Sequence, residues 1–184
     1  MRTFIFMTAL ICLAGCAFEP QVVQVQPVLK PSVQTVGKGS AVSVIVADER
    51  PTQSLGQRGA DNMGAELTVG DTLAGTVRSS IEQGLTANGF QIAPGGRLLD
   101  VEIRGLDYVV SSGMWNGKIR ADCALKAACD SGHGAYDQFY RGHFERKVQV
   151  IADKEENNRY VSEAVSNAIN LLLSDPALAR CLAQ

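Results

Sequence analysis

The cysteine at position 16 is preceded by residues that direct a specific covalent chemistry. The sequence LAGC ends at Cys16 and follows a basic start at Arg2 and a short apolar run, which is the arrangement of a bacterial lipoprotein signal. The run is too short to span a bilayer, which takes about 20 apolar residues. We predict a signal peptide at residues 1–15 and a diacylglycerol anchor, with a third acyl chain on the freed amine, at Cys16. The alternatives are an ordinary secretory signal cleaved nearby or an uncleaved helix.

Three further cysteines would remain in the mature chain, in a compartment that favours disulfides. Cys123 and Cys129 have the same parity on a predicted strand, whose apolar face should meet the helices, and Cys181 lies on the predicted last helix. We predict one disulfide that joins Cys181 to Cys123 or to Cys129. Such a bridge is worth about 4 kcal/mol in the chain-entropy model. The alternative is three buried free thiols.

The two histidines of the chain offer little for catalysis or for metal binding. No nucleophile elbow of the form G-x-S-x-G accompanies them. Cys123, Cys129, His133 and His143 have spacings that match no common zinc site. On an extended strand the two cysteines would also stand about 20 Å apart. We therefore expect no catalytic residues, no metal and no cofactor, and we interpret the chain as a protein that is not an enzyme.

Two places in the sequence are candidates for binding a partner. Asp48 and Arg50 lie where a predicted strand ends and a long polar loop, residues 49–68, begins. The alternative is that these two side chains pair and brace the loop. Trp115 lies in a glycine-flanked hairpin tip, where an exposed indole would suit a protein or glycan contact. The alternative for Trp115 is packing in the core.

Hydrophobic periodicity predicts the elements that must position these residues. Strands are predicted over 41–48, 98–110, 118–129 and 138–151, and helices over 71–88 and 158–173, with a short last helix that ends near 182. The apolar face of the second strand shifts by one residue at Gly105, which predicts a β-bulge. We expect an α+β fold with a mainly antiparallel four-stranded sheet, two main helices packed on one face, and a short C-terminal helix.

The chain is long enough for one domain beyond the signal. We predict a lipidated N-terminus and proline-containing tether at 16–40, in which residues 21–26 alternate enough to add an edge strand, and a single periplasmic domain at 41–184. The formal net charge of −2 indicates no broad basic surface, so no nucleic-acid partner is expected.

The sequence resembles the YajG family of small lipoproteins. The resemblance starts at the LAGC motif and continues through DERP at 48–51, LTANGFQIAPGG at 85–96, QFYRGHF at 138–144 and SEAVSNAINLLLSD at 162–175. It implies an outer-membrane lipoprotein that faces the periplasm, without an agreed biochemical activity. Ala17, rather than aspartate, follows Cys16, which also favours the outer membrane. Cys123, Cys129 and Cys181 depart from the family pattern, so the resemblance supplies no disulfide.

These observations leave two hypotheses for function. The first is a lipid-anchored binding or assembly module for an envelope protein complex or the peptidoglycan layer. The second is an envelope enzyme or small-ligand carrier with a pocket at the 49–68 loop. The sequence leaves the oligomeric state open.

Overall fold

The computed structural model describes residues 19–30, 36–59, 64–111, 117–130, 134–148 and 152–184. These residues form one eight-stranded sheet and three helices. The strands are β1 (Gln21–Val23), β2 (Ala41–Asp48), β3 (Ser54–Gln57), β4 (Glu66–Val69), β5 (Gln91–Ile92), β6 (Arg97–Ser111), β7 (Gly117–Asp130) and β8 (Ala135–Val148). The helices are α1 (Leu73–Ala87), α2 (Lys154–Leu173) and α3 (Pro176–Ala183).

The sheet is mixed, so the expected mainly antiparallel four-stranded sheet with two packed helices is wrong. β6, β7 and β8 are long antiparallel neighbours, but β2 and β3 both lie parallel to β6, and β1 lies parallel to β4. The chain reaches β6 from β2 through α1, and a helical crossover of this kind is what places two strands parallel. β1, β3, β4 and β5 have two to four residues each, which is too short for alternation to identify.

The region predicted as one long polar loop, residues 49–68, contains β3 and most of β4. After β2, which pairs with the first part of β6, the chain moves away from β6. It returns at β3, where Gly56 pairs with Tyr108 of β6. This detour spans the β6 bulge, where the register with β7 shifts between Ile103 and Gly105. The bulge predicted at Gly105 is therefore confirmed.

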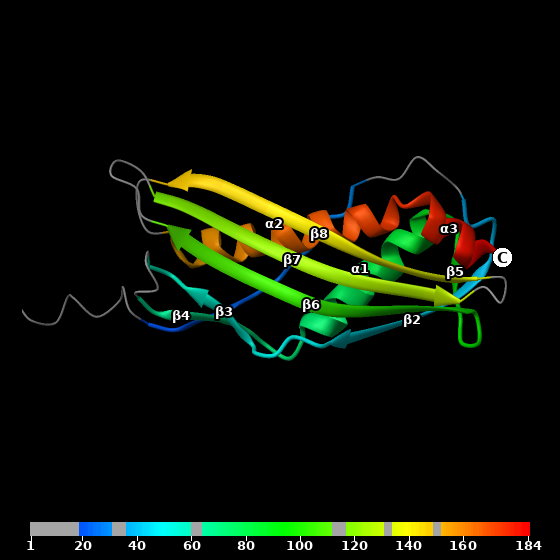
Figure 1. Ribbon diagram of the computed structural model, residues 1–184, viewed down its shortest axis with the longest axis horizontal. Helices are drawn as coiled ribbons and strands as arrows, with labels where there is room; N and C mark the ends of the chain where they lie inside the picture. The colour runs from blue at the N-terminus through cyan, green and yellow to red at the C-terminus, as the bar shows by residue number, and fades with distance from the viewer. Residues whose placement is uncertain (1–18, 31–35, 60–63, 112–116, 131–133, 149–151) are drawn as a thin grey trace, which may run out of the picture.

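All three helices pack on one face of the sheet, and Figure 1 shows them behind the long strands. The core lies between these layers, and β6 contributes Leu99, Val101 and Ile103 before the bulge and Leu106 and Tyr108 after it. The opposite face of the sheet carries none of the three helices. We call this opposite face the outer face.

α2 begins four residues before the predicted start. Asp153 accepts a hydrogen bond from the Glu156 backbone N–H, and the Glu156 side chain accepts one from the Asp153 backbone, which completes a capping box. Gly142 allows β8 to approach this helix closely, because a Cβ atom there would overlap the Ala164 carbonyl oxygen and the Ala168 nitrogen. Close contact between β8 and α2 fixes one wall of the site described next.

Candidate functional site

A cleft of about 400 Å³ lies beside β8 and the C-terminal half of α2. Two cations, one imidazole and two amides line it: Lys30, Arg141, His143, Asn167 and Asn170, together with Leu171, Leu173 and Ser174. We call this the β8 cleft. Neither this cleft nor the two other hollows described, beside the N-terminal segment and beside α3, is lined by residues 49–68. The pocket expected at that loop is therefore not one of the three hollows.

Lys30 reaches the β8 cleft because residues 21–30, which we call the strap, run in extended form along α2. β1 is the first part of the strap, and it lies at the sheet edge, as the alternation predicted. Alternate backbone N–H groups then bind polar side chains spaced four residues apart on α2. The bonds run from Gln24 to Asn158 (3.1 Å), Gln26 to Ser162 (2.9 Å), Val28 to Ser166 (2.9 Å) and Lys30 to Asn170 (2.8 Å).

This ladder forms because two repeats match. Four residues of α-helix rise about 6.0 Å, and two residues of polyproline-like chain rise about 6.2 Å. Pro27 has no N–H, and it occupies one of the alternate positions that donate nothing to the ladder. Asn170 holds the last rung at two points, because its Nδ2 also donates to the Val28 carbonyl oxygen at 3.1 Å. The segment predicted as a tether thus has a docked part that places Lys30 at the cleft.

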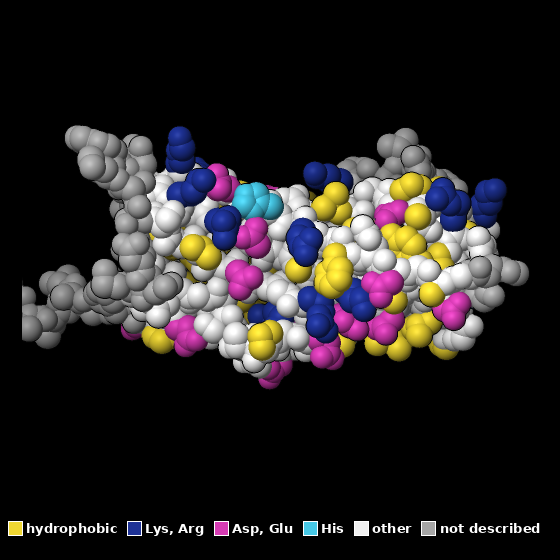
Figure 2. Space-filling view, in the orientation of Figure 1, with side chains coloured by type: hydrophobic (Ala, Val, Ile, Leu, Met, Phe, Trp, Pro, Cys, Tyr) yellow, Lys and Arg dark blue, Asp and Glu magenta, His cyan; other side chains and the backbone are white. Residues whose placement is uncertain are grey.

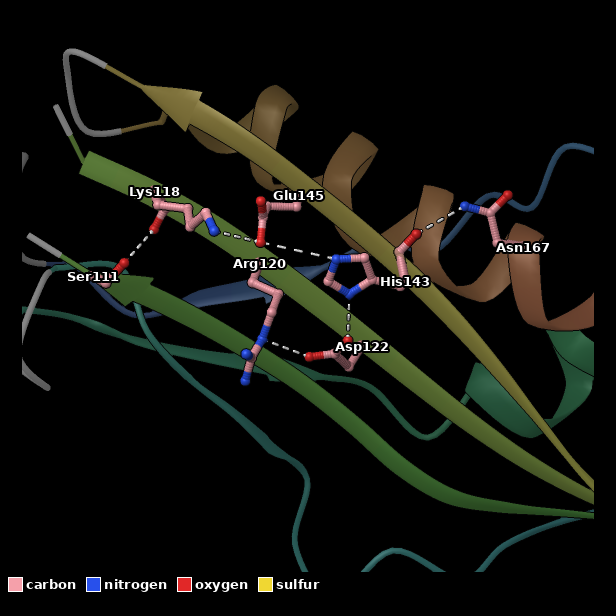
Figure 3. Close-up of polar contacts among 7 residues, drawn as sticks. All are labelled: Ser111, Lys118, Arg120, Asp122, His143, Glu145 and Asn167. Atoms are coloured by element: carbon pink, nitrogen blue, oxygen red, sulfur yellow. Dashed lines mark hydrogen bonds and ion pairs between the residues drawn. The ribbon is translucent and has the colours of Figure 1, made fainter.

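His143 connects the β8 cleft to a row of charged side chains on the outer face (Figure 3). Its Nδ1 lies 2.7 Å from Asp122, and its Nε2 lies 4.0 Å from Glu145. Asn167, on α2, donates to the His143 carbonyl oxygen at 3.1 Å. Both imidazole nitrogens therefore face carboxylates, and the backbone of the same residue is tied to the helix.

The cations of this row are already neutralised. Lys118 pairs with Glu145 at 2.8 Å, and Arg120 pairs with Asp122 at 2.8 Å. Figure 2 shows acidic and basic side chains mixed over this face, with a histidine (cyan) among them. Since these pairs are exposed to solvent, they contribute little to stability. Their main effect is to leave the row without excess charge.

The two cations of the β8 cleft differ from those of the row. Among the described residues, neither Lys30 nor Arg141 has a carboxylate partner, and no aspartate or glutamate lines the cleft. The Arg141 guanidinium lies 5.7 Å from the centre of the Phe139 ring, an interaction that leaves its N–H donors available. The cleft is therefore a local positive site in a chain whose formal net charge is −2.

Asp48 and Arg50 pair with each other. Arg50 Nε and Nη2 lie 2.8 and 2.7 Å from the two Asp48 carboxylate oxygens, and the Arg50 side chain is only 3% exposed. The hydrogen bond from Arg50 lowers the pKa of Asp48, although partial burial acts in the opposite direction. This is the geometry of the bracing alternative, and a partner contact by these residues stays a prediction.

A disulfide joins Cys129 of β7 to Cys181 of α3, one of the two pairings that the sequence left open. Cys123 is a free, buried thiol, and burial raises its pKa to about 12. Cys123 faces the helices whereas His143 is exposed on the outer face, so the sheet separates these two members of the considered metal set. Within the described ranges, no group of three or more metal-ligating side chains comes together. Cys16, Trp115 and His133 lie outside the described residues.

Comparison with known proteins identifies the family. Residues 27–183 match the model of a family described as uncharacterized lipoprotein. The chain belongs to this lipoprotein family. YajG of Escherichia coli strain K12, an uncharacterized lipoprotein, is 28% identical over 173 residues, which cover 92% of this chain and 88% of the relative. The YajG resemblance is thereby confirmed, and a lipoprotein is held to its membrane by lipid.

Two crystal structures share the fold of this lipoprotein. A Xanthomonas campestris protein has a TM-score of 0.52 at 11% identity, over 84% of this chain and 92% of its own. A putative neuraminyllactose-binding hemagglutinin homolog from Helicobacter pylori has a TM-score of 0.53 at 6% identity, over 86% of this chain and 97% of its own. In the part of this chain that the structure describes, no helix is long and apolar enough to cross a membrane.

The predicted anchor can be tested directly. Cys16→Ser should abolish incorporation of a labelled palmitate and leave the precursor unprocessed, because serine offers no thiol for the diacylglycerol. The measurement is metabolic labelling followed by mass analysis of the N-terminus. Cys12→Ser, which changes a cysteine within the predicted signal, is the control and should keep its label. Normal labelling of Cys16→Ser would show that the lipid is attached elsewhere.

Proposed function

We propose that this lipoprotein is a binding module anchored in the outer membrane and facing the periplasm, where it holds an envelope protein complex or the peptidoglycan layer. Lipoprotein membership supports the anchoring, and Ala17 after Cys16 supports the outer membrane. The observation that carries the binding role is the β8 cleft. It combines unpaired cations, amide side chains and exposed leucine surface at one concave place.

The same geometry favours binding over turnover. A histidine acts as a general base when a free ring nitrogen reaches a nucleophile. Nδ1 of His143 lies 2.7 Å from Asp122 and Nε2 lies 4.0 Å from Glu145, and among the described residues no hydroxyl or thiol is hydrogen-bonded to either ring nitrogen. The hydroxyl of Ser174 donates to the Leu171 carbonyl oxygen at 3.0 Å, and it thereby completes the end of α2. We therefore assign His143 and Ser174 no catalytic role.

The test is capture of a partner in cells. Arg141→Gln should lose a crosslinked partner, or sedimentation with peptidoglycan, because it removes one of the two unpaired cations of the cleft. Lys147→Gln is the matched control, since it removes an exposed cation from the same strand outside the cleft. The measurement is mass spectrometry of material copurified with each variant at equal abundance. Equal recovery of the same partner by both variants would place the binding surface elsewhere, and Trp115→Ala would then test the predicted hairpin tip.

A further inference from the structure

We infer that the β8 cleft binds the carboxylate side chains of an extended acidic peptide segment that belongs to a partner protein. This inference rests on the proposed binding function and names the chemistry of the ligand. It follows from two features of the structure, the charges of the cleft and the free edge of β8, and it is compatible with the predicted anchor at Cys16.

The unpaired positive charges of the cleft favour an anionic ligand. Lys30 and Arg141 have no carboxylate partner among the described residues, whereas the neighbouring Lys118, Arg120 and Lys126 each have one. The planar fork of Arg141 matches a carboxylate with two parallel hydrogen bonds. An asparagine amide has two N–H donors. Asn167 and Asn170 each have one engaged, with the carbonyl oxygens of His143 and Val28. Each therefore keeps a second donor for the ligand.

The edge of β8 can bind a peptide in an extended conformation. Within the described sheet β8 pairs with β7 alone, so its other edge has no strand partner. The His143 carbonyl points to that free edge, since Asn167 binds it from α2. Asn167 already occupies that carbonyl, but backbone groups of alternate residues point the same way, so the Arg141 N–H and carbonyl face this edge as well. A peptide can add as a strand at such an edge, with apolar contacts from exposed Phe139 and Leu171.

The β8 cleft lies far along α2 from Glu19, the first described residue after the predicted anchor. Glu19 lies 4.0 Å from Lys154 in the first turn of α2, and Cys16 is three residues earlier, a reach of about 11 Å. Asn167 and Ser174 lie 13 and 20 residues beyond Lys154, which is about 20 to 30 Å along the helix axis. Figure 1 shows the start of the strap and α3 toward opposite ends of the molecule. An anchor at Cys16 therefore leaves the cleft able to face a partner protein.

The docked strap completes the site, because Lys30 reaches the cleft only when Asn170 holds the last rung of the ladder. Releasing that rung removes one cation from the cleft without changing any charge in the protein. Asn170→Ala should therefore weaken binding of an anion at least as much as Lys30→Gln, because it also removes the free amide donor of Asn170. The double variant should bind no more weakly than Asn170→Ala alone, since that change has already withdrawn Lys30 from the cleft.

The experiment uses the full mature lipidated chain in detergent micelles and a six-residue peptide of alternating glutamate and valine, acetylated and amidated at its ends. Isothermal titration should show binding that the glutamine analogue of the peptide lacks. Arg141→Gln should weaken it roughly tenfold, and Lys147→Gln should change it by less than about twofold. Hydrogen exchange at the Arg141 amide should slow when the peptide is bound.

Three results would overturn the inference. The first is equal affinity for the glutamate and glutamine peptides, and the second is equal affinity of the wild type and Arg141→Gln. The third combines two observations: inorganic phosphate binds with the same dependence on Arg141, and the peptide leaves hydrogen exchange at the Arg141 amide unchanged. Together they would make the occupant a free anion. Loss of cellular capture by Arg141→Gln without any acidic-peptide binding would refute this ligand and keep the proposed function.

Discussion

Ile169→Asp is expected to lower the free energy of unfolding by more than about 4 kcal/mol, because it places an unpaired carboxylate in the core. Ile169 is 0% exposed and lies on the face of α2 that packs on the sheet and α1. Denaturant unfolding of the purified lipoprotein, followed by circular dichroism, measures the change.

Leu171→Asp is the matched control for this variant. Leu171 lies two residues away on the same helix and is 50% exposed, so its replacement should change the free energy of unfolding by no more than about 0.5 kcal/mol. Equal unfolding midpoints for the two variants would mean that α2 presents a different face to the core.

Cys181→Ser is expected to lower the free energy of unfolding by about 4 kcal/mol, because it removes a cross-link between residues 52 apart in sequence. Unfolding of the oxidised wild type should move to the same midpoint on addition of a reductant, whereas Cys181→Ser should not respond to it. A wild type that is insensitive to reductant would show that the bridge adds nothing to stability.

The fold should survive the loss of this bridge. Asp175 caps α3 by accepting from the Ala177 backbone N–H at 2.7 Å, and it also accepts from the Tyr140 hydroxyl of β8 at 2.9 Å. Burial acts to raise the pKa of Asp175, but hydrogen bonds from the Tyr136 hydroxyl, the Ala177 N–H and the Tyr140 hydroxyl together lower it. The carboxylate thus stays charged and keeps α3 attached to the sheet without the disulfide.

The sequence predicts elements whose burial pattern repeats over many residues. Alternation identifies β7 and locates the β6 bulge, and the stripe through Val161, Ala168 and Leu172 identifies α2. It does not predict which strands pair, since pairing depends on residues far away in the chain. Strands as short as β5, with two residues, give no measurable period. For these reasons the predicted strand at 41–48 was not recognised as a parallel neighbour of β6, and β3 was not predicted.

The candidate site is less visible in the sequence than the fold. Lys30, Arg141 and Asn167 come from three separate segments, and nothing local marks them as neighbours. One signal was present, because Asn158, Ser162, Ser166 and Asn170 repeat every four residues beside the apolar stripe of α2. By itself such a polar stripe is typical of the solvated face of an amphipathic helix, and only the structure shows that the strap lies along it.

The ladder between the strap and α2 also fixes which residues of the strap face the helix. Its rungs alternate between residues that donate an N–H to the helix and residues that do not, and Pro27 is fixed in the second class. Losing or gaining one residue between β1 and Pro27 would exchange the classes and bring proline opposite a serine acceptor. Changes of two residues would keep the classes and slide the strap by one rung. Length variation in this part of the strap should therefore be tolerated in even steps, a parity rule set by a helix more than a hundred residues away.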